Sequence, residues 1–227
     1  MSLFRISDTW KKTFPEAHTG VLILRDLTNP THHPGLEERK EALQEELRTR
    51  YSGQDRAELL KQPVLQAYAA YYRQFNKTYH VQLQLESLLF KGKPIPTVAS
   101  MVEAMFMAEM NNLLLTAGHD LDAVVAPVRL DVAKGSESYT LLRGDVQNPK
   151  AGDMMITDRQ AIISSIVYGP DQRTQIRGET RNVLFTVYAP SGISSQLIEH
   201  HLQEIQQNVR LVAENAQLEM LEVFGAS

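Results

Sequence analysis

The sequence contains no cysteine among its 227 residues. This absence excludes a disulfide framework, a catalytic thiol, iron–sulfur clusters and cysteine-based zinc sites. Long apolar runs are also missing, because the most apolar long stretch, 98–115, contains Glu103, Glu109, Asn111 and Asn112. We therefore predict no membrane-spanning helix. The first residues lack the basic start and apolar core of a secretory signal, and together with the lack of cysteine this favours a cytoplasmic protein.

Several catalytic signatures are absent as well. The sequence has neither a P-loop nor a G-x-G-x-x-G fingerprint, and no serine lies in a nucleophile-elbow arrangement. Its histidine pairs, 32–33 and 200–201, are adjacent residues, whereas helical metal ligands are three or four residues apart. His200 and Glu204 have that spacing, but no further ligand accompanies them. We expect no metal and no cofactor.

Charge is nearly balanced overall but unevenly distributed. With 23 Lys and Arg against 27 Asp and Glu, the net charge of −4 argues against a protein that coats DNA or RNA. The segment 63–97 nevertheless contains Arg73, Lys77, Lys91 and Lys93 against the single acid Glu86. This excess predicts a modest basic face suited to a phosphate backbone. Ordinary variation of surface charge is the alternative interpretation.

Hydrophobic patterns predict a mixture of helices and strands. An α+β fold, a mixed β-sheet with covering helices, is the expected class, because most predicted helices precede most predicted strands. No linker rich in Gly, Ser or Pro divides the chain, so a single domain over residues 1–227 is expected. The predicted helices are 36–51, 63–75, 99–115 and 195–214, and the predicted strands are 21–24, 124–132, 154–157, 162–167, 183–188 and 218–224.

Two polar stretches could carry chemistry. In the first, 116–122, a glycine is followed by His119 and Asp120 in a predicted strand-edge loop, a position suited to proton transfer or ligand recognition. Asp120 as a simple turn cap is the alternative. The second comprises 168–174, which includes Arg173, and 178–182. It could cradle a phosphate or form an ordinary hairpin loop.

Four sets of motifs, in order along the chain, resemble one known family. They are Tyr71-Tyr72-Arg73-Gln74-Phe75 with Glu86-Ser87-Leu88-Leu89 and Pro94-Ile95-Pro96, then Gly118-His119-Asp120-Leu121-Asp122, then Gly152-Asp153-Met154-Met155-Ile156-Thr157-Asp158, and Thr180-Arg181-Asn182-Val183-Leu184-Phe185. This order is similar to the B3/B4 tRNA-editing domain of the phenylalanyl-tRNA synthetase beta subunit, in a freestanding form. The resemblance is strongest over residues 20–190, and residues 191–227 form a helix–strand extension.

The resemblance implies a trans-editing aminoacyl-tRNA deacylase. Such an enzyme hydrolyses the ester of a mischarged tRNA and thereby acts as a second sieve after synthesis. Its partner would be the tRNA 3′ end, with a synthetase or another protein as a further possible partner. By the same resemblance His119 is the active-site histidine. The implied pocket residues are Asp120, Thr180, Asn182 and Thr186, and the implied tRNA contacts are Arg73, Lys77, Lys91, Lys93 and Arg173.

The chain also departs from the family pattern. Thr186 stands where synthetase members carry a glutamate that reads a tyrosine hydroxyl, so another amino acid or a loss of catalysis is implied. Ala99 and Phe106 stand where asparagines are common, which implies a more apolar pocket. Two alternatives of other classes remain. One is a non-catalytic module that binds tRNA or an amino acid, and the other is an interaction domain that uses the acidic C-terminal helix.

Overall fold

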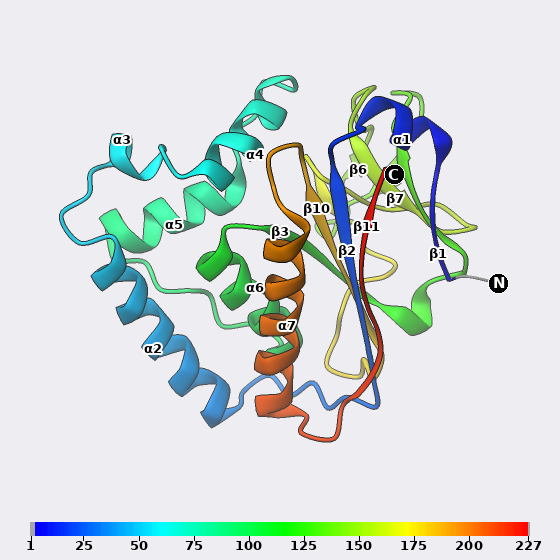
Figure 1. The fold of residues 1–227 in the computed structure, drawn as a ribbon. Coiled ribbons are helices and arrows are strands. Elements are labelled where there is room, and N and C mark those ends of the chain that lie inside the picture. Colours follow the sequence, from blue (N-terminus) through cyan, green and yellow to red (C-terminus); the bar gives the residue numbers. More distant parts are fainter. Residues whose placement is uncertain (1–2, 227) are drawn as a thin grey trace.

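The computed structural model describes residues 3–226 and contains two main β-sheets, with most of the helices gathered beside one of them (Figure 1). The first sheet is antiparallel and has the order β11-β2-β10-β3. Its central strands, β2 and β10, are almost fully buried, whereas β3 and β11 lie at its edges. The bounds are β2 (His18–Arg25), β3 (Leu115–Asp120), β10 (Val183–Ala189) and β11 (Gln217–Gly225).

The second sheet is mixed and has the order β1-β4-β7-β8-β9. Strand β1 pairs with β4 in parallel, and the remaining pairs are antiparallel. A two-stranded ribbon, β5 with β6, lies in the segment between β4 and β7. The bounds are β1 (Phe4–Ile6), β4 (Val128–Val132), β5 (Tyr139–Thr140), β6 (Val146–Gln147), β7 (Met154–Thr157), β8 (Ile162–Ser165) and β9 (Gly169–Pro170).

Helices α6 and α7 pack against each other, and α7 crosses the antiparallel sheet over β2 (Figure 1). Gly20 in β2 permits this close approach, because a Cβ there would lie 2.5 Å from Ile198 Cγ2 and 3.0 Å from Leu202 Cδ1 of α7. The bounds are α1 (Asp8–Thr13), α2 (Pro34–Arg50), α3 (Arg56–Leu59), α4 (Pro63–Arg73), α5 (His80–Lys91), α6 (Ser100–Asn112), α7 (Ser195–Val212) and the 3₁₀ turn η1 (Leu121–Ala123).

One buried tyrosine joins the helices to the antiparallel sheet. The Tyr68 hydroxyl in α4 accepts a hydrogen bond of 2.9 Å from the Leu115 N–H in β3 and donates one to the Tyr188 carbonyl in β10. Tyr68 also stacks on Tyr79, with ring centroids 4.1 Å apart. The hydroxyl therefore bridges β3 and β10 at the point where β3 begins.

The expected α+β class, with a mixed sheet and covering helices, is confirmed. One expectation was wrong at the place that matters most for function. The predicted helix 99–115 ends at Asn112, because Leu113 adopts the left-handed conformation with φ 62°. Residues 115–120 are then a strand and not a loop, since they pair with the buried strand β10. In the part of the chain from 3 to 226, every helix is too short or too polar to cross a bilayer.

Candidate functional site

A largely apolar cavity of about 480 Å³ lies beside the free edge of β3. This volume is typical of sites for small molecules. Three parts of the fold form most of the cavity wall, namely the α5–α6 region, strand β3, and the turn from β8 to β9, and residues 142, 175, 176 and 188 complete it. Its apolar wall includes Val98, Ala99, Val102, Met105, Phe106, Leu115, Ala117, Ile166, Ile176 and Leu142, and its polar groups include His80, Gln84, Glu109, Ser165, Gln175 and Tyr188.

The edge of β3 presents backbone hydrogen-bonding groups to this cavity. The N–H of Thr116 points away from β10 and binds Glu109, and that of Asp120 binds the Thr174 carbonyl. Since orientations alternate along a strand, the N–H and C=O of Gly118 face the same free edge. Gly118 has no side chain to cover them. A Cβ there would lie 2.9 Å from Ile176 Cδ1, 3.1 Å from Phe185 Cε1 and 3.3 Å from Met105 Sδ.

Glu109 is the one carboxyl group on the cavity wall among the described residues. Its side chain is almost completely buried, and Oε1 accepts a hydrogen bond of 2.7 Å from the Thr116 N–H. Burial raises the pKa of Glu109 to about 8, and the hydrogen bond from Thr116 opposes that rise. A carboxyl group with such a pKa changes its protonation state near neutral pH, as a general acid or base requires.

His80 contributes a neutral imidazole to the same cavity. Its Nδ1 lies 3.1 Å from the Tyr72 hydroxyl, which donates its own hydrogen to the Ile166 carbonyl. The hydroxyl must therefore accept at His80, so Nδ1 carries the proton and Nε2 is left as an acceptor. Burial lowers the pKa of His80 to about 4, so the ring is uncharged at neutral pH.

Ser165 is held by a buried carboxyl group behind the cavity wall. Its Oγ donates to Asp153 Oδ2 at 2.7 Å and accepts from the Tyr168 N–H at 3.1 Å. The other Asp153 oxygen accepts from the Tyr71 hydroxyl at 2.7 Å. Burial raises the pKa of Asp153 to about 6. These bonds tie α4, β7 and β8 together and occupy both the donor and an acceptor site of the serine.

His119 lies inside the fold and not on the cavity wall. Its side chain is fully buried, with Nδ1 2.8 Å from Thr174 Oγ1 and with Nε2 enclosed without a hydrogen-bond partner in the described structure. Burial, together with the nearby Arg173, lowers the pKa of His119 to about 3. A neutral, enclosed imidazole is suited to holding the 171–174 turn against β3, and it has no direct contact with the cavity.

Three of the other implied pocket residues gather at the C-terminal end of β3, away from the cavity wall. Asp120 accepts a hydrogen bond of 2.7 Å from the Thr180 hydroxyl, and its second oxygen caps η1 through the Asp122 N–H. Asn182 donates to both carboxylate oxygens of Asp122 at 2.9 Å. The structure thus brings Asp120, Thr180 and Asn182 into one neighbourhood, where Thr180 binds Asp120 and Asn182 binds the nearby Asp122.

Thr186, and the two residues that depart from the family pattern before it, Ala99 and Phe106, lie closer to the cavity. Thr186 is buried in β10 opposite Ala117, whose carbonyl accepts a long hydrogen bond of 3.5 Å from its hydroxyl. Ala117 lines the cavity, so Thr186 lies one strand behind the wall. Ala99 and Phe106 line the cavity directly. The wall at those two positions is accordingly apolar.

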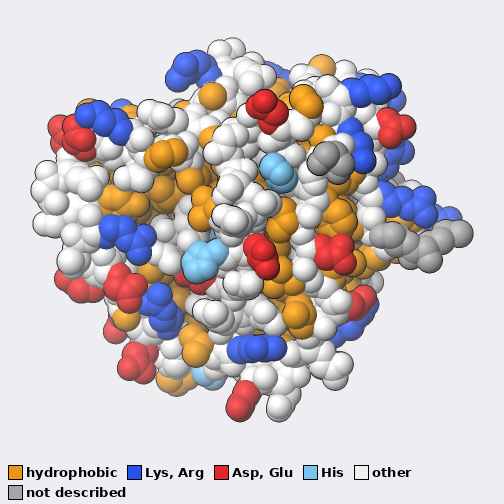
Figure 2. Space-filling model, viewed as in Figure 1, with side chains coloured by type: hydrophobic (Ala, Val, Ile, Leu, Met, Phe, Trp, Pro, Cys, Tyr) orange, Lys and Arg blue, Asp and Glu red, His pale blue; other side chains and the backbone are white. Residues whose placement is uncertain are grey.

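The five implied tRNA contacts fall into two groups. Arg73, Lys77, Lys91 and Lys93 are exposed and, within residues 3–226, form no ion pair, although Lys77 lies 5.8 Å from the centre of the Tyr168 ring. Arg173 instead pairs with Asp158 at 2.8 Å and donates to the Ala123 carbonyl. Figure 2 shows acidic and basic side chains mixed over the α7 face.

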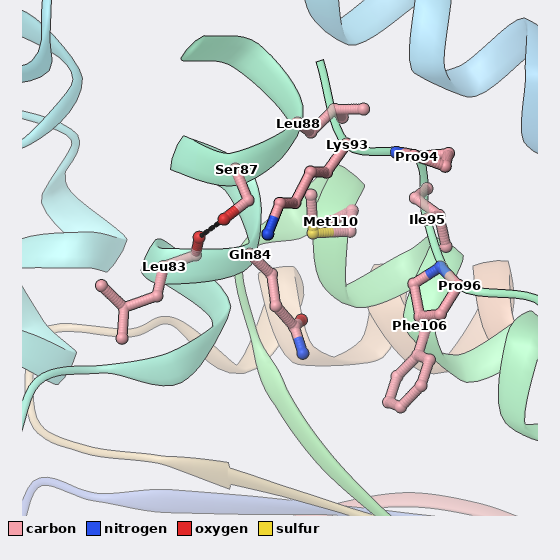
Figure 3. A pocket seen from close by; sticks show the side chains of 10 residues that line it. All are labelled: Leu83, Gln84, Ser87, Leu88, Lys93, Pro94, Ile95, Pro96, Phe106 and Met110. Carbon is pink, nitrogen blue, oxygen red and sulfur yellow. Dashed lines mark hydrogen bonds between the residues drawn. The ribbon is translucent and has the colours of Figure 1, made fainter. Parts of the chain in front are cut away.

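A second, smaller pocket of about 190 Å³ adjoins the cavity (Figure 3). The two pockets share Gln84 of α5 and Phe106 of α6. Its remaining wall is formed by α5, by the segment that leads from α5 to α6, and by Met110 of α6. It includes Leu83, Ser87, Leu88, Lys93, Pro94, Ile95 and Pro96.

The fold and these pockets define an α+β domain with a small-molecule cavity at a sheet edge. The family model of the B3/4 domain matches residues 64–217, which is more than half of the chain. The chain therefore belongs to the B3/4 domain family. The match includes α4 to α6, β3 and β10, and with them both pockets.

The chain also matches a solved structure. It is an N-terminal fragment of the phenylalanyl-tRNA synthetase beta-subunit from Pyrococcus horikoshii, with a TM-score of 0.48 and 10% sequence identity. The alignment covers 97% of this chain and 53% of that one, so the chain spans about half the length of the fragment. Among curated proteins, none matches.

Sequence reasoning overlooked the polar groups that line the cavity. From the sequence, Glu109 is noted only as a charge that interrupts an apolar stretch. His80 and Gln84 are not among the predicted site residues. A signal was present, because Val98, Val102, Met105 and Glu109 follow the spacing of one helical face. A carboxylate within an apolar face is unusual unless it is paired or functional.

Proposed function

We propose that this protein is an aminoacyl-tRNA deacylase, which hydrolyses the ester between an amino acid and the 3′ end of tRNA. One observation carries the proposal: Glu109, a buried carboxyl group that titrates near neutral pH, borders an apolar cavity at an open strand edge. Membership of the B3/4 domain family and the ordered motifs that resemble the tRNA-editing domain support the same activity. An aminoacyl ester is already activated, so its hydrolysis needs few catalytic groups.

The reaction begins with a water molecule beside Glu109. The ionised carboxylate accepts a proton from this water as the oxygen attacks the ester carbonyl carbon. Negative charge then develops on the carbonyl oxygen, and the N–H of Gly118 is oriented to donate a hydrogen bond to it. When the C–O bond to the ribose breaks, the proton held by Glu109 passes to the departing 3′ oxygen. The products are a free amino acid and a tRNA with an intact 3′ hydroxyl.

The cavity wall selects the amino acid. Apolar groups such as Val102, Met105 and Ile176 favour an apolar side chain, because burying a charged one without a partner is costly. Ala99 and Phe106 add apolar surface at its helical side. We therefore expect the preferred esters to carry an aliphatic or aromatic amino acid. Discrimination by one methylene group is worth about 1–3 kcal/mol, which is the reason a separate hydrolytic sieve is useful.

The test is release of amino acid from a panel of aminoacyl-tRNAs, correctly charged and mischarged. We expect the wild-type protein to hydrolyse at least one apolar aminoacyl-tRNA, and Glu109→Gln to lose at least 100-fold of that rate. Glu86→Gln is the matched control, since Glu86 lies on α5 but lines neither pocket. If no ester in the panel is hydrolysed while tRNA binds in a salt-sensitive manner, the protein is a binding module and the proposal is wrong.

A further inference from the structure

Another pocket, of about 360 Å³, lies among the helices, where the residue after α3 meets α4 and α5 (Figure 1). The proposed hydrolysis does not use it, because none of its residues lines the cavity that contains Glu109. Its wall combines apolar groups with polar side chains, and it consists of Leu60, Leu65, Gln66, Ala69, Arg73 and Gln82. A pocket of this size and mixed composition suits a small ligand that has both a polar and an apolar part.

Arg73 supplies this pocket with a guanidinium group that has no partner of its own. It is exposed at the end of α4 and, in the described part of the chain, forms neither an ion pair nor a side-chain hydrogen bond. Helix α4 has no acidic residue. The acid of α3, Glu58, pairs with Lys61, and the acid of α5 is Glu86, which pairs with Arg56. Arg73 is therefore free to bind a carboxylate from outside the chain, through two parallel hydrogen bonds.

Gln82 supplies the same pocket with a hydrogen-bond acceptor. The residue is only 4% exposed, and its Nε2 donates a hydrogen bond of 2.7 Å to Glu86 Oε1. Because a carboxylate only accepts, the amide nitrogen must face Glu86, and Oε1 is the end of the amide that is left over. This oxygen has no hydrogen-bond partner among the described residues. A buried amide with a free acceptor beside a pocket is suited to an N–H group of a ligand.

Apolar surface lies between these two polar groups. Leu65 is buried, and Leu60 and Ala69 are half-buried. Positions 65, 69 and 73 are one turn apart on α4, so its apolar wall and its guanidinium group share one helix face. A ligand that uses the whole pocket carries a carboxylate, an N–H donor and an apolar group. An apolar amino acid has these three groups on one carbon atom.

We propose that this pocket binds the carboxylate end of an apolar amino acid, either free or as the last residue of a peptide. Arg73 binds the carboxylate, the Gln82 oxygen accepts from the α-nitrogen, and the leucines and Ala69 contact the side chain. The pocket is separate from the hydrolytic cavity, so this binding does not require ester hydrolysis.

An NMR titration of the isotopically labelled full chain compares N-acetyl-leucine with N-acetyl-leucinamide, which lacks the carboxylate. We expect signals of Ala69 and Gln82 to shift, and the acid to bind at least tenfold more tightly than the amide. Arg73→Gln should weaken binding of the acid at least tenfold. Arg210→Gln, which removes an equal exposed charge from α7, should leave it unchanged. Equal affinities for acid and amide, equal losses in the two variants, or the absence of any shift at these residues would overturn the inference.

A second variant blocks the pocket without removing a charged partner. Ala69→Glu places a carboxylate one turn before Arg73 on the same helix, in the order that stabilises a helix, so we expect the variant to fold. The new carboxylate competes with the ligand for the guanidinium group, and affinity for N-acetyl-leucine should fall at least tenfold. Unchanged affinity in this variant would contradict the assigned site.

Three further ligands identify what the pocket accepts. Tighter binding of free leucine than of a short peptide that ends in leucine supports an amino-acid site, and the reverse order supports a site for a peptide C-terminus. Either order agrees with the proposed chemistry. Displacement of N-acetyl-leucine by an equal concentration of inorganic phosphate would instead show that Arg73 belongs to a general anion site, and it would overturn the inference.

Discussion

The Glu109 carboxyl group of α6 accepts a hydrogen bond of 2.7 Å from the backbone N–H of Thr116 in β3. This bond uses an N–H at the free edge of the sheet, where no neighbouring strand accepts it. It fixes one carboxyl oxygen, and within residues 3–226 the other oxygen has no hydrogen-bond partner at the cavity wall. The hydrogen bond holds the Glu109 carboxyl group against the edge of β3. The helix α6 and the strand β3 therefore determine the geometry of the site together.

The first prediction concerns the pH dependence of ester hydrolysis. Burial raises the pKa of Glu109 to about 8, so at pH 6 to 7 only a small fraction of the protein carries the ionised base. We expect kcat/KM to rise about tenfold per pH unit below pH 8 and to level off above it. Initial rates between pH 6 and 9 on one aminoacyl ester, at constant ionic strength, measure this profile.

Glu109→Gln supplies the background for that measurement, because aminoacyl esters also hydrolyse spontaneously as the pH rises. The amide keeps an oxygen that can accept from the Thr116 N–H but cannot accept the proton of water. The enzyme-dependent rise should therefore vanish in this variant while the fold remains. A wild-type profile that is flat between pH 6 and 8, or highest at acid pH, would rule out Glu109 as the base.

The second prediction separates water attack from attack by a serine. Ser165 lies on the cavity wall, but its hydroxyl already binds Asp153 and the Tyr168 N–H. We expect Ser165→Ala to retain the hydrolytic rate within about threefold and to lose about 1–3 kcal/mol of stability, since a buried carboxyl group loses a donor. Steady-state rates and urea unfolding measure the two effects. An inactive but folded variant, with an initial burst of released tRNA in the wild type, would instead indicate a covalent intermediate.

The fold was largely predictable from local patterns, whereas the edge strand was not. The apolar runs of β2, β7, β8 and β10 contain the β-branched and aromatic residues that favour strands, and each is found in the structure. Leu113 ends α6 in a left-handed conformation that a leucine rarely adopts. Gly118 is a more familiar helix end, so the sequence pattern predicts a longer helix through a segment that tertiary pairing makes a strand.

The candidate site was harder to predict for a related reason. Sequence motifs predict His119, Thr180 and Asn182 as site residues, but their side chains form hydrogen bonds within the fold, away from the cavity wall. The cavity is formed by residues far apart in the chain, and its boundary depends on how α6 meets the edge of β3. The one local indication of the cavity in the sequence is the apolar helical face that contains Glu109. The raised pKa of this residue depends on its burial in the folded protein.

The third prediction concerns the surface of the strand edge. Gly118→Ala adds a methyl group that meets Ile176, Phe185 and Met105 at 2.9 to 3.3 Å, so side chains of the cavity must move. We expect a loss of at least tenfold in kcat/KM and of about 1–3 kcal/mol in stability. Gly178→Ala is the control, because its added Cβ would meet only the Asn29 carbonyl, at 4.0 Å. Equal effects of the two substitutions would show that the edge of β3 does not shape the site.

The fourth prediction concerns His119. Its imidazole is enclosed and holds Thr174, so His119→Ala removes a buried hydrogen bond and leaves a void. We expect a loss of about 2 kcal/mol of stability, with kcat per folded molecule unchanged within about threefold. Thermal unfolding and rates corrected for the folded fraction measure both. A fully folded variant without activity would show that His119 takes part in the chemical step. The substrate or a water molecule would then need access from the cavity to the imidazole ring.

The last prediction is a maximum of stability near pH 6.5, set by five buried groups. His80, His119 and His201 have pKa values lowered by burial to about 4, 3 and 3. They stay neutral in the folded protein, whereas unfolded histidines are protonated below about pH 6.5. Their contribution to stability is therefore present above that pH and is lost as the pH falls. Burial raises the pKa values of Asp153 and Glu109 to about 6 and 8, so their contribution is present at low pH and is lost as the pH rises.

The opposing effects can be combined. Each proton that the unfolded chain binds and the folded protein does not adds about 1.4 kcal/mol per pH unit. Between about pH 4.5 and 6 the three histidines outweigh the two carboxyl groups by about one proton, so stability rises with pH. Close to pH 7 the histidines of the unfolded chain have lost most of their protons, so Glu109 dominates and stability falls until about pH 8. Urea midpoints at pH 5, 6.5 and 8 test this. Glu109→Gln should abolish the decline above pH 6.5, and a wild-type stability that rises steadily to pH 8 would contradict the raised pKa of Glu109.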